Sequence, residues 1–300
     1  MRYQQLFNHK QSQSELAYIP FVILGDPTYQ LSLKIIERLV ESGADALELG
    51  FAFSDPVADG PVIQAASLRP LANHFSIKDG FKLIKQVRDK YPQLPLGLLT
   101  YANLVFAQGI DGFYQQASAA GLDSVLIADC PVQEGALFSK SASEHGIDTV
   151  YIAPPDADQQ TLKLIAENSS GYTYVLSRKG ITGTEVAASQ ANLDFIAQLK
   201  ALGSPPLVQG FGISEPEHVY QAAQAGVDAI ITGSAIVKLI NQHYNEPQVM
   251  LAKIADYANL MASAARQALK AHDRNNQDKG SIDVDSRDNK RGTAQAGAAS

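Results

Sequence analysis

Three acidic side chains lie close together in the stretch LELGFAFSDPVADGP, residues 47–61. Glu48 stands between two leucines in a run typical of a buried strand, and Asp55 and Asp59 follow in a loop. Because side chains alternate along a strand, Glu48 points away from the leucines, and burial raises the pKa of such a carboxyl toward neutrality. We interpret Glu48 as a general acid/base and Asp59 as a second catalytic carboxylate. The alternatives are a buried ion pair for Glu48 and turn-forming roles for both aspartates.

Three glycine-bearing turns suggest a phosphate site. They are SRKGITGTE at 177–185, QGFGIS at 209–214 and TGSAIVKLI at 232–240. In the last turn, Gly233 and Ser234 precede a short apolar helix, whose N–H groups and positive end attract an anion. The chain has 24 basic and 31 acidic residues without a dense basic run, so we expect backbone amides to hold the phosphate. Each glycine turn alone is also compatible with an ordinary turn.

Metal and imine chemistry have less support in the sequence. The six histidines show no ligand spacing and none ends a predicted strand, so we expect no metal site. Lys179 follows the sixth predicted strand and keeps an imine-forming aldolase open as an alternative. Cys130 has no nearby histidine to activate it and is interpreted as strand-end packing. QGFGISEP lacks the third glycine of a dinucleotide-binding fingerprint.

The elements that must position these residues carry a repeated pattern of helix end, glycine, aspartate and strand. It occurs four times, as SGADALELG (42–50), AGLDSVLIAD (120–129), HGIDTVYIA (145–153) and AGVDAIITG (225–233). The glycines suit the left-handed position after a helix, and the apolar runs suit strands buried on both faces. The other predicted strands are 18–24, 96–100, 172–177 and 207–210. Eight strands alternating with helices predict an α/β fold, a TIM (β/α)8 barrel, with an open α/β sheet as the alternative.

Composition limits the class of protein and its surroundings. A chain of 300 residues with a net charge of -7 can bury a large core and is poorly suited to nucleic acid. It shows neither a signal peptide nor a membrane span, and its one cysteine fits a reducing compartment, so we expect a cytoplasmic location. We expect residues 1–271 to form a single catalytic TIM-barrel domain. Residues 272–300, poor in large apolar side chains, are predicted to be a disordered tail.

Several long motifs, in order from about Tyr3 through Lys270, resemble those of the α subunit of tryptophan synthase. They are PFVILGDP, ADALELGFAFSDPVADGP, LLTYANLVF, GYTYVLSRKGITG, QGFGIS and TGSAIVK. The resemblance implies a lyase that cleaves indole-3-glycerol phosphate into indole and glyceraldehyde 3-phosphate by a retro-aldol reaction without a cofactor. It also implies an α2β2 assembly with a β subunit, which carries pyridoxal phosphate and receives the indole.

The resemblance also implies roles for individual residues. Glu48 becomes the general acid/base, and Asp59 becomes the carboxylate that assists at the indole N–H. Asp55 and Asn103, in segments on the active-site side, are expected at the interface with the β subunit. The residues implied in substrate binding, as pocket wall or phosphate cradle, are Phe21, Leu99, Tyr101, Ile152, Tyr174, Thr182, Gly183, Phe211, Gly212, Gly233 and Ser234.

Two departures from the family pattern stand out. Phe51 and Ala52 occupy the place of a Val-Pro-like pair, so the loop that carries Asp55 and Asp59 lacks one constraint on its backbone. Lys179 stands where a small polar residue is common. Two other classes of protein stay open: another phosphate-binding TIM barrel, either an imine-forming aldolase or an isomerase, and a non-catalytic subunit that binds a ligand and regulates its partner.

Overall fold

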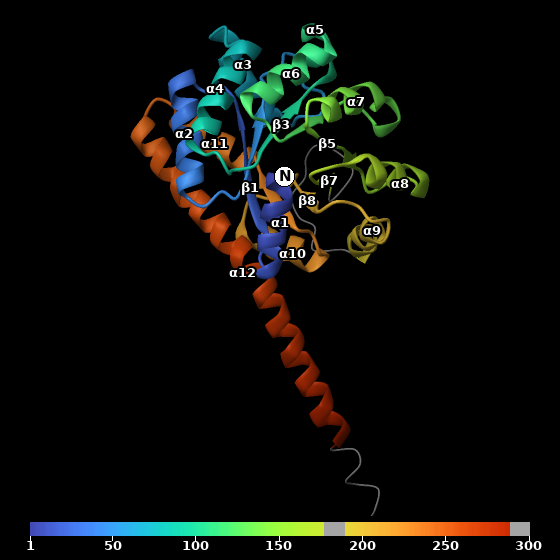
Figure 1. Ribbon diagram of the computed structural model, residues 1–300. Helices are drawn as coiled ribbons and strands as arrows, with labels where there is room; N and C mark the ends of the chain where they lie inside the picture. Colours follow the sequence, from blue (N-terminus) through green and yellow to red (C-terminus); the bar gives the residue numbers. More distant parts are fainter. Residues whose placement is uncertain (177–189, 289–300) are drawn as a thin grey trace, which may run out of the picture.

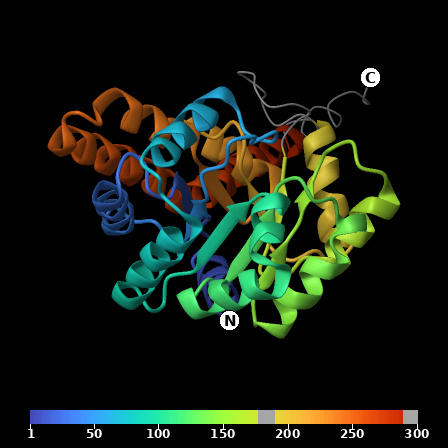
Figure 2. The same ribbon diagram turned by 90° about the horizontal axis from the view of Figure 1, so that it is seen from above.

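A ring of parallel strands surrounded by helices forms the body of the protein (Figure 1). This computed structural model describes residues 1–176 and 190–288, and of 271–288 only the backbone. Within those residues the strands are β1 (Ala17–Ile23), β2 (Leu47–Gly50), β3 (Leu96–Thr100), β4 (Ser124–Ile127), β5 (Asp148–Val150), β6 (Ile152–Ala153), β7 (Thr173–Val175), β8 (Leu207–Gln209) and β9 (Ala229–Thr232). The helices are α1 (Arg2–Ser12), α2 (Tyr29–Glu41), α3 (Pro61–Ala72), α4 (Ile77–Lys90), α5 (Ala102–Gln108), α6 (Ile110–Ala120), η1 (Val132–Glu134), α7 (Ala136–Glu144), α8 (Gln159–Asn168), α9 (Gln190–Ala201), α10 (Pro216–Ala225), α11 (Ser234–His243) and α12 (Pro247–Asp288). The view from above shows the helices packed along the outside of the strands (Figure 2).

The sheet closes on itself as a barrel. Its strand order is β5-β4-β3-β2-β1-β9-β8-β7-β6, and the two end strands are separated in sequence only by Tyr151. The Tyr174 N–H of β7 donates to the Tyr151 carbonyl at 3.0 Å, which carries the pairing across this point. The predicted TIM barrel is therefore confirmed. The fifth predicted strand, which ends the repeat at 145–153, is divided at Tyr151 into β5 and β6, so the structure has one strand more than predicted.

Side-chain alternation divides the strand residues between two apolar clusters. Leu47 and Leu49 of β2 belong to the outer cluster, together with Ile35 of α2. Phe21 of β1 belongs to the inner cluster that fills the barrel. Glu48 lies between the two leucines and therefore faces the interior. Burial of one leucine side chain stabilises the fold by about 1.5–3 kcal/mol, so a register shift that exchanged the two faces would be costly.

The glycines of the repeated pattern have the backbone conformation that the sequence predicts. Positive φ angles are found at Gly43 (+97°), Gly121 (+86°), Gly146 (+70°) and Gly226 (+91°). A residue with a Cβ is strained at such angles, whereas glycine is not. Each glycine thus lets the chain turn sharply from a helix into the next strand.

The aspartates of the repeat hold neighbouring strands together at their N-terminal ends. Three of them accept a hydrogen bond from a backbone N–H at the start of the preceding strand: Asp45 from Tyr18 at 2.9 Å, Asp123 from Leu96 at 2.8 Å and Asp228 from Leu207 at 2.8 Å. The fourth, Asp148, is hydrogen-bonded by Ser170 instead. A carboxylate that accepts a backbone N–H of the neighbouring strand helps to fix the register of the two strands.

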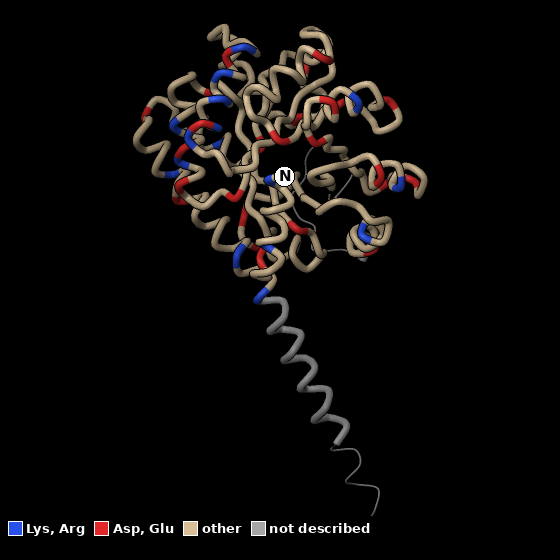
Figure 3. Tube along the Cα trace, in the orientation of Figure 1, with Lys and Arg blue, Asp and Glu red and all other residues tan. Residues whose placement is uncertain are grey.

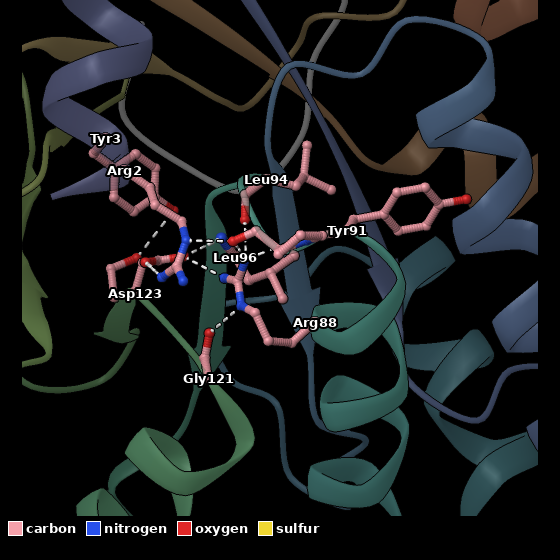
Figure 4. Close-up of polar contacts among 10 residues, drawn as sticks. Arg2, Tyr3, Arg88, Tyr91, Leu94, Leu96, Gly121 and Asp123 are labelled. Atoms are coloured by element: carbon pink, nitrogen blue, oxygen red, sulfur yellow. Dashed lines mark hydrogen bonds and ion pairs between the residues drawn. The ribbon is translucent and has the colours of Figure 1, made fainter.

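Helix α1 covers the N-terminal end of the barrel and lies in front of its centre in Figure 1. Tyr3 and Phe7 of this helix are buried in the inner cluster. Arg2 and Arg88 both bind Asp123, with N–O distances of 2.7 Å and 2.6 Å to its two carboxylate oxygens (Figure 4). Arg88 also donates to several backbone carbonyls, including that of Gly121 at 2.9 Å. This network fixes α1 against the strand ends opposite to those where a TIM barrel carries its active site.

Helix α12 closes the described part of the chain. The predicted amphipathic face is present, with Ile254, Ala258 and Met261 buried. The helix continues to Asp288, so its backbone passes the expected end of the domain at residue 271. This helical backbone differs from the disorder expected there, and the division into a domain of 1–271 and a tail of 272–300 stays a prediction.

Charged residues of both signs are interspersed over the described part of the chain (Figure 3). No helix among the described residues is long and apolar enough to cross a membrane.

Candidate active site

Glu48 lies inside the barrel, where its residue is only 1% exposed. It pairs in register with Gly97 of β3, and a Cβ at Gly97 would lie 2.7 Å from Glu48 Oε2. Glycine at this position therefore leaves the room that the carboxyl group occupies. Burial raises the pKa of Glu48 from 4.5 to about 7, and a hydrogen bond from Tyr172 opposes the shift. A carboxyl with this pKa can both donate and accept a proton at neutral pH.

Two buried tyrosines adjoin the Glu48 carboxyl. The Tyr172 hydroxyl donates to Glu48 Oε2. The ring of Tyr172 meets that of Tyr3 edge-on, with centroids 5.3 Å apart, and Ser124 Oγ donates to the Tyr3 hydroxyl at 3.1 Å. Glu48 Oε1 has no hydrogen-bond partner among the described residues. Tyr172 thus fixes one oxygen of the carboxyl group, and the other keeps an unused capacity for hydrogen bonding.

Asp59 lies in the loop between β2 and α3, beyond the C-terminal end of its strand. The Tyr101 hydroxyl donates to Asp59 Oδ2 at 2.9 Å, and Gln64 Nε2 donates to the Asp59 carbonyl at 2.8 Å. Burial raises the pKa of Asp59, and the hydrogen bond from Tyr101 opposes that shift. The loop thus presents a carboxyl group whose direction is set by a neighbouring strand end.

Tyr174 of β7 lies within electrostatic reach of both carboxyl groups. Burial is the main cause of its raised pKa, and the negative charges of Glu48 and Asp59 each raise it further. Its hydroxyl occupies the space beside Gly210, where a Cβ would lie 1.6 Å from it. The charges of Glu48 and Asp59 thus both reach Tyr174, although the two carboxyl groups differ in burial and in hydrogen bonding.

The inner cluster contains most of the predicted pocket wall. Phe21 and Tyr174 belong to this cluster, and the partly buried side chains of Leu99, Ile152 and Phe211 pack against it. Tyr101, 1% exposed, differs from these because its hydroxyl binds Asp59 at the end of β3. The same cluster contains Ile63, Ala66, Leu126 and Ile231, which the sequence pattern does not single out. Tyr172 is not singled out either, although alternation in GYTYV places it on the same face as Tyr174.

The expected phosphate site is described in part. Gly233 is the N-cap of α11 and follows β9, and Ser234 is the first residue of that helix. A Cβ at Gly233 would lie 3.0 Å from Phe21 Cδ1, so this helix start adjoins the inner wall. Gly212, after β8, has a positive φ of +86°. Thr182, Gly183 and Lys179 lie outside the described residues.

The two residues expected at a partner interface are both exposed. Asp55 lies in the loop after β2 and Asn103 on α5 after β3, so they belong to consecutive strand-helix units on one end of the barrel.

Cys130 packs against the outer cluster, and burial raises the pKa of its thiol. Within residues 1–176 and 190–270, no group of three or more His, Cys, Asp or Glu side chains is arranged to hold a metal ion.

Comparison with known proteins identifies the family. The family model for the tryptophan synthase alpha chain matches residues 7–266. The chain is 52% identical over 263 residues to the tryptophan synthase alpha chain of Shewanella baltica, covering 88% of this chain and 96% of that one. Identity to the Vibrio vulnificus alpha chain is 50% over 266 residues, with 89% and 99% covered.

Solved structures agree with this assignment. Tryptophan synthase subunit alpha from Legionella pneumophila superposes with a TM-score of 0.80 at 30% identity, covering 88% of this chain and 98% of that chain. A chain of the Pyrococcus furiosus tryptophan synthase complex gives a TM-score of 0.74 at 31% identity, with 83% and 98% covered. The chain belongs to the tryptophan synthase alpha chain family.

Proposed function

We propose that this protein is a lyase of tryptophan biosynthesis that cleaves indole-3-glycerol phosphate into indole and glyceraldehyde 3-phosphate. The observation that carries the proposal is Glu48, a carboxyl group inside an apolar barrel with a pKa of about 7. Asp59 supplies a second carboxyl near the same space. Membership of the family supports the choice of substrate.

The reaction breaks the bond between C3 of the indole ring and the first carbon of the glycerol chain. Indole departs only if C3 gains a proton, and the hydroxyl on that first carbon loses its proton as the aldehyde forms. Glu48 serves both transfers in turn because its pKa lies near the working pH. Asp59 accepts a hydrogen bond from the ring N–H and stabilises the positive charge that develops there. The step needs no redox partner.

The substrate phosphate is held by backbone N–H groups at the start of α11, beside Gly233 and Ser234, and by the turn at Gly212. The first turn of a helix has N–H groups without acceptors inside the helix, and the helix dipole adds to their attraction for an anion. We propose Thr182 and Gly183 as further phosphate ligands on the strength of the sequence motif. The apolar side chains of the inner cluster hold the indole ring.

The product indole passes to a β subunit in an α2β2 assembly in the cytoplasm. Asp55 and Asn103 are the proposed contacts, because both are exposed on the end of the barrel that carries Asp59. We propose that the α chain uses no cofactor of its own and that pyridoxal phosphate belongs to the β subunit. The catalytic unit is residues 1–271.

The test is release of indole from indole-3-glycerol phosphate by the purified full-length chain, with and without the β subunit. Free indole is separated from the substrate by chromatography before it is measured, because indole-3-glycerol phosphate contains the same fluorescent ring. We expect indole and glyceraldehyde 3-phosphate in equal amounts, formed faster with the β subunit. Borohydride added during turnover should trap no adduct at Lys179, whereas an imine-forming aldolase would be trapped there. Absence of indole under both conditions would contradict the proposal.

A further inference from the structure

The loop at residues 51–60 joins β2 to α3 and carries Asp59. Its first residue, Phe51, is 4% exposed and meets the Phe81 ring edge-on, with centroids 5.3 Å apart. The Phe51 ring occupies space beside Gly80, where a Cβ would lie 2.2 Å from a ring carbon. The buried side chain of Phe51 therefore fixes the start of the loop, although Ala52 provides no backbone constraint of the kind that proline would.

Phe53 provides the next contact of this loop. Its ring stacks on Tyr101, with centroids 5.1 Å apart and planes inclined by 28°. Tyr101 directly follows β3 and is the N-cap residue of α5. A residue from the loop of one strand-helix unit thus lies on the ring of the next unit, and stacking of this kind restricts how the covered ring can tilt.

The hydroxyl of Tyr101 returns to the same loop. It donates to Asp59 Oδ2 at 2.9 Å and is hydrogen-bonded by the backbone of Ala58. A tyrosine hydroxyl stands at the far end of the side chain, and the torsion that turns its ring has a broad energy well. A small tilt of the Tyr101 ring would therefore move the hydroxyl out of hydrogen-bonding geometry with Asp59.

We propose that Phe53 is a positioning residue for Asp59 that acts through Tyr101. The stacked ring holds the Tyr101 hydroxyl within hydrogen-bonding distance of Asp59 Oδ2, so that the carboxylate keeps its orientation. This inference rests on the proposed function of Asp59 in the lyase reaction. Phe53 itself needs no contact with the substrate.

Electrostatics gives the proposal a second readout. Burial raises the pKa of Asp59 and the Tyr101 hydrogen bond opposes the rise, so loss of that bond should raise the pKa further. Activity that requires ionised Asp59 falls as the pH is lowered through the pKa of Asp59. A raised pKa therefore moves this fall to a higher pH. Among the described residues, the charge of Asp129 reaches Tyr101, and the charges of Glu48 and Asp59 both reach Tyr174. Burial raises the pKa of Tyr174, so this tyrosine stays neutral in the pH range of the assay. Glu48 has a pKa of about 7 and ionises within that range, so its titration must be distinguished from that of Asp59.

The perturbation is Phe53→Leu in the full-length chain, with Phe53→Tyr as the conservative variant. Loss of a hydrogen bond to a charged group predicts a fall in kcat of about tenfold or more for Phe53→Leu, with KM within about threefold. Phe53→Tyr keeps the stack and should remain within about twofold of the parent. Leu260→Ala is the control, because Leu260 is exposed on α12, away from the site and from the proposed partner contacts, and its kcat should not change.

A double-mutant cycle with Tyr101→Phe decides whether Phe53 acts through the hydroxyl. Tyr101→Phe keeps the ring and removes the donor, so Phe53→Leu added to it should lower kcat by less than about twofold. The same tenfold fall in both backgrounds, or an unchanged kcat in Phe53→Leu alone, would overturn the proposal.

Titration of the Asp59 carboxyl by carbon NMR, assigned with Asp59→Asn, gives a test that needs no activity. We expect Phe53→Leu and Tyr101→Phe to raise the Asp59 pKa alike, and an unchanged value in Phe53→Leu would also overturn the proposal. If the parent released no indole, the proposed function would fail, while this titration would still test the positioning.

Discussion

Replacement of Glu48 by glutamine changes the chemistry of the site while keeping its shape. Glutamine fills the same volume opposite Gly97, and its amide oxygen can accept the hydrogen bond that Tyr172 donates to Glu48 Oε2. Only the titrating proton is lost. If Glu48 is the acid/base, turnover should fall by roughly 10² to 10⁴, the usual contribution of such a group, and substrate binding should change little.

The same variant should change stability in a pH-dependent way. The pKa of Glu48 is raised from 4.5 to about 7, so the folded state binds more protons than the unfolded state between these values. Stability of the parent therefore falls as pH rises through this window and is constant above it. The raised pKa lowers the free energy of unfolding of the parent by about 3 kcal/mol at pH 8 and by less than about 1 kcal/mol at pH 5. Glutamine does not ionise, so the free energy of unfolding of Glu48→Gln lacks this pH dependence. The variant should therefore gain stability relative to the parent between pH 5 and pH 8, by about the difference between the two values.

Two assays check this reasoning. Single-turnover cleavage of indole-3-glycerol phosphate with the β subunit present measures the chemical step, and urea unfolding at pH 5 and pH 8 measures stability. Glu41→Gln, a change at an exposed glutamate, is the control for both. A Glu48→Gln rate within threefold of the parent would refute the catalytic role. Equal stability differences at the two pH values would refute the assignment of a raised pKa.

Three further outcomes test other parts of the site. Gly97→Ala should lower turnover at least about tenfold, because its Cβ would lie 2.7 Å from Glu48 Oε2 and 2.9 Å from the Tyr3 hydroxyl, and unchanged kinetics would count against that crowding. Gly233→Asp should raise KM at least about tenfold by placing a carboxylate beside the phosphate, more than Gly233→Ala does, and equal KM values in the two variants would argue against an anion there. Truncation after Ala271 should leave kcat and Tm unchanged, since the removed segment is poor in apolar side chains, and a large drop in Tm would show that it contributes to the fold.

Local periodicity accounts for what the sequence alone could predict. The barrel follows from repeated glycine and aspartate positions, and the inward direction of Glu48 follows from its place between Leu47 and Leu49. Those features depend on residues close together in the chain, where helix ends and strand alternation leave a readable pattern.

Other features depend on contacts between residues far apart in the chain. The hydrogen bond from Tyr172 to Glu48 joins positions 124 apart and leaves no local trace. Helix α1 buries only three side chains, those of Tyr3, Phe7 and Lys10. Three positions are too few to give a clear helical period of apolar residues in the sequence. The division of one predicted strand at Tyr151 lies where its pairing passes from β4 to β7, and the local sequence does not mark this change of partner.

The strand order also has a consequence for how the chain folds. Every pair of neighbouring strands is consecutive in sequence except β1 and β9, where Pro20 lies opposite Thr232. The hydrogen bond from the Tyr18 N–H to Asp45, by contrast, joins residues only 27 positions apart. Since closing a longer loop costs more entropy and local contacts form sooner, we expect two half-barrels, β1 to β5 and β6 to β9, to assemble separately. The joint between β1 and β9 should then be the last to form and should limit the rate of refolding.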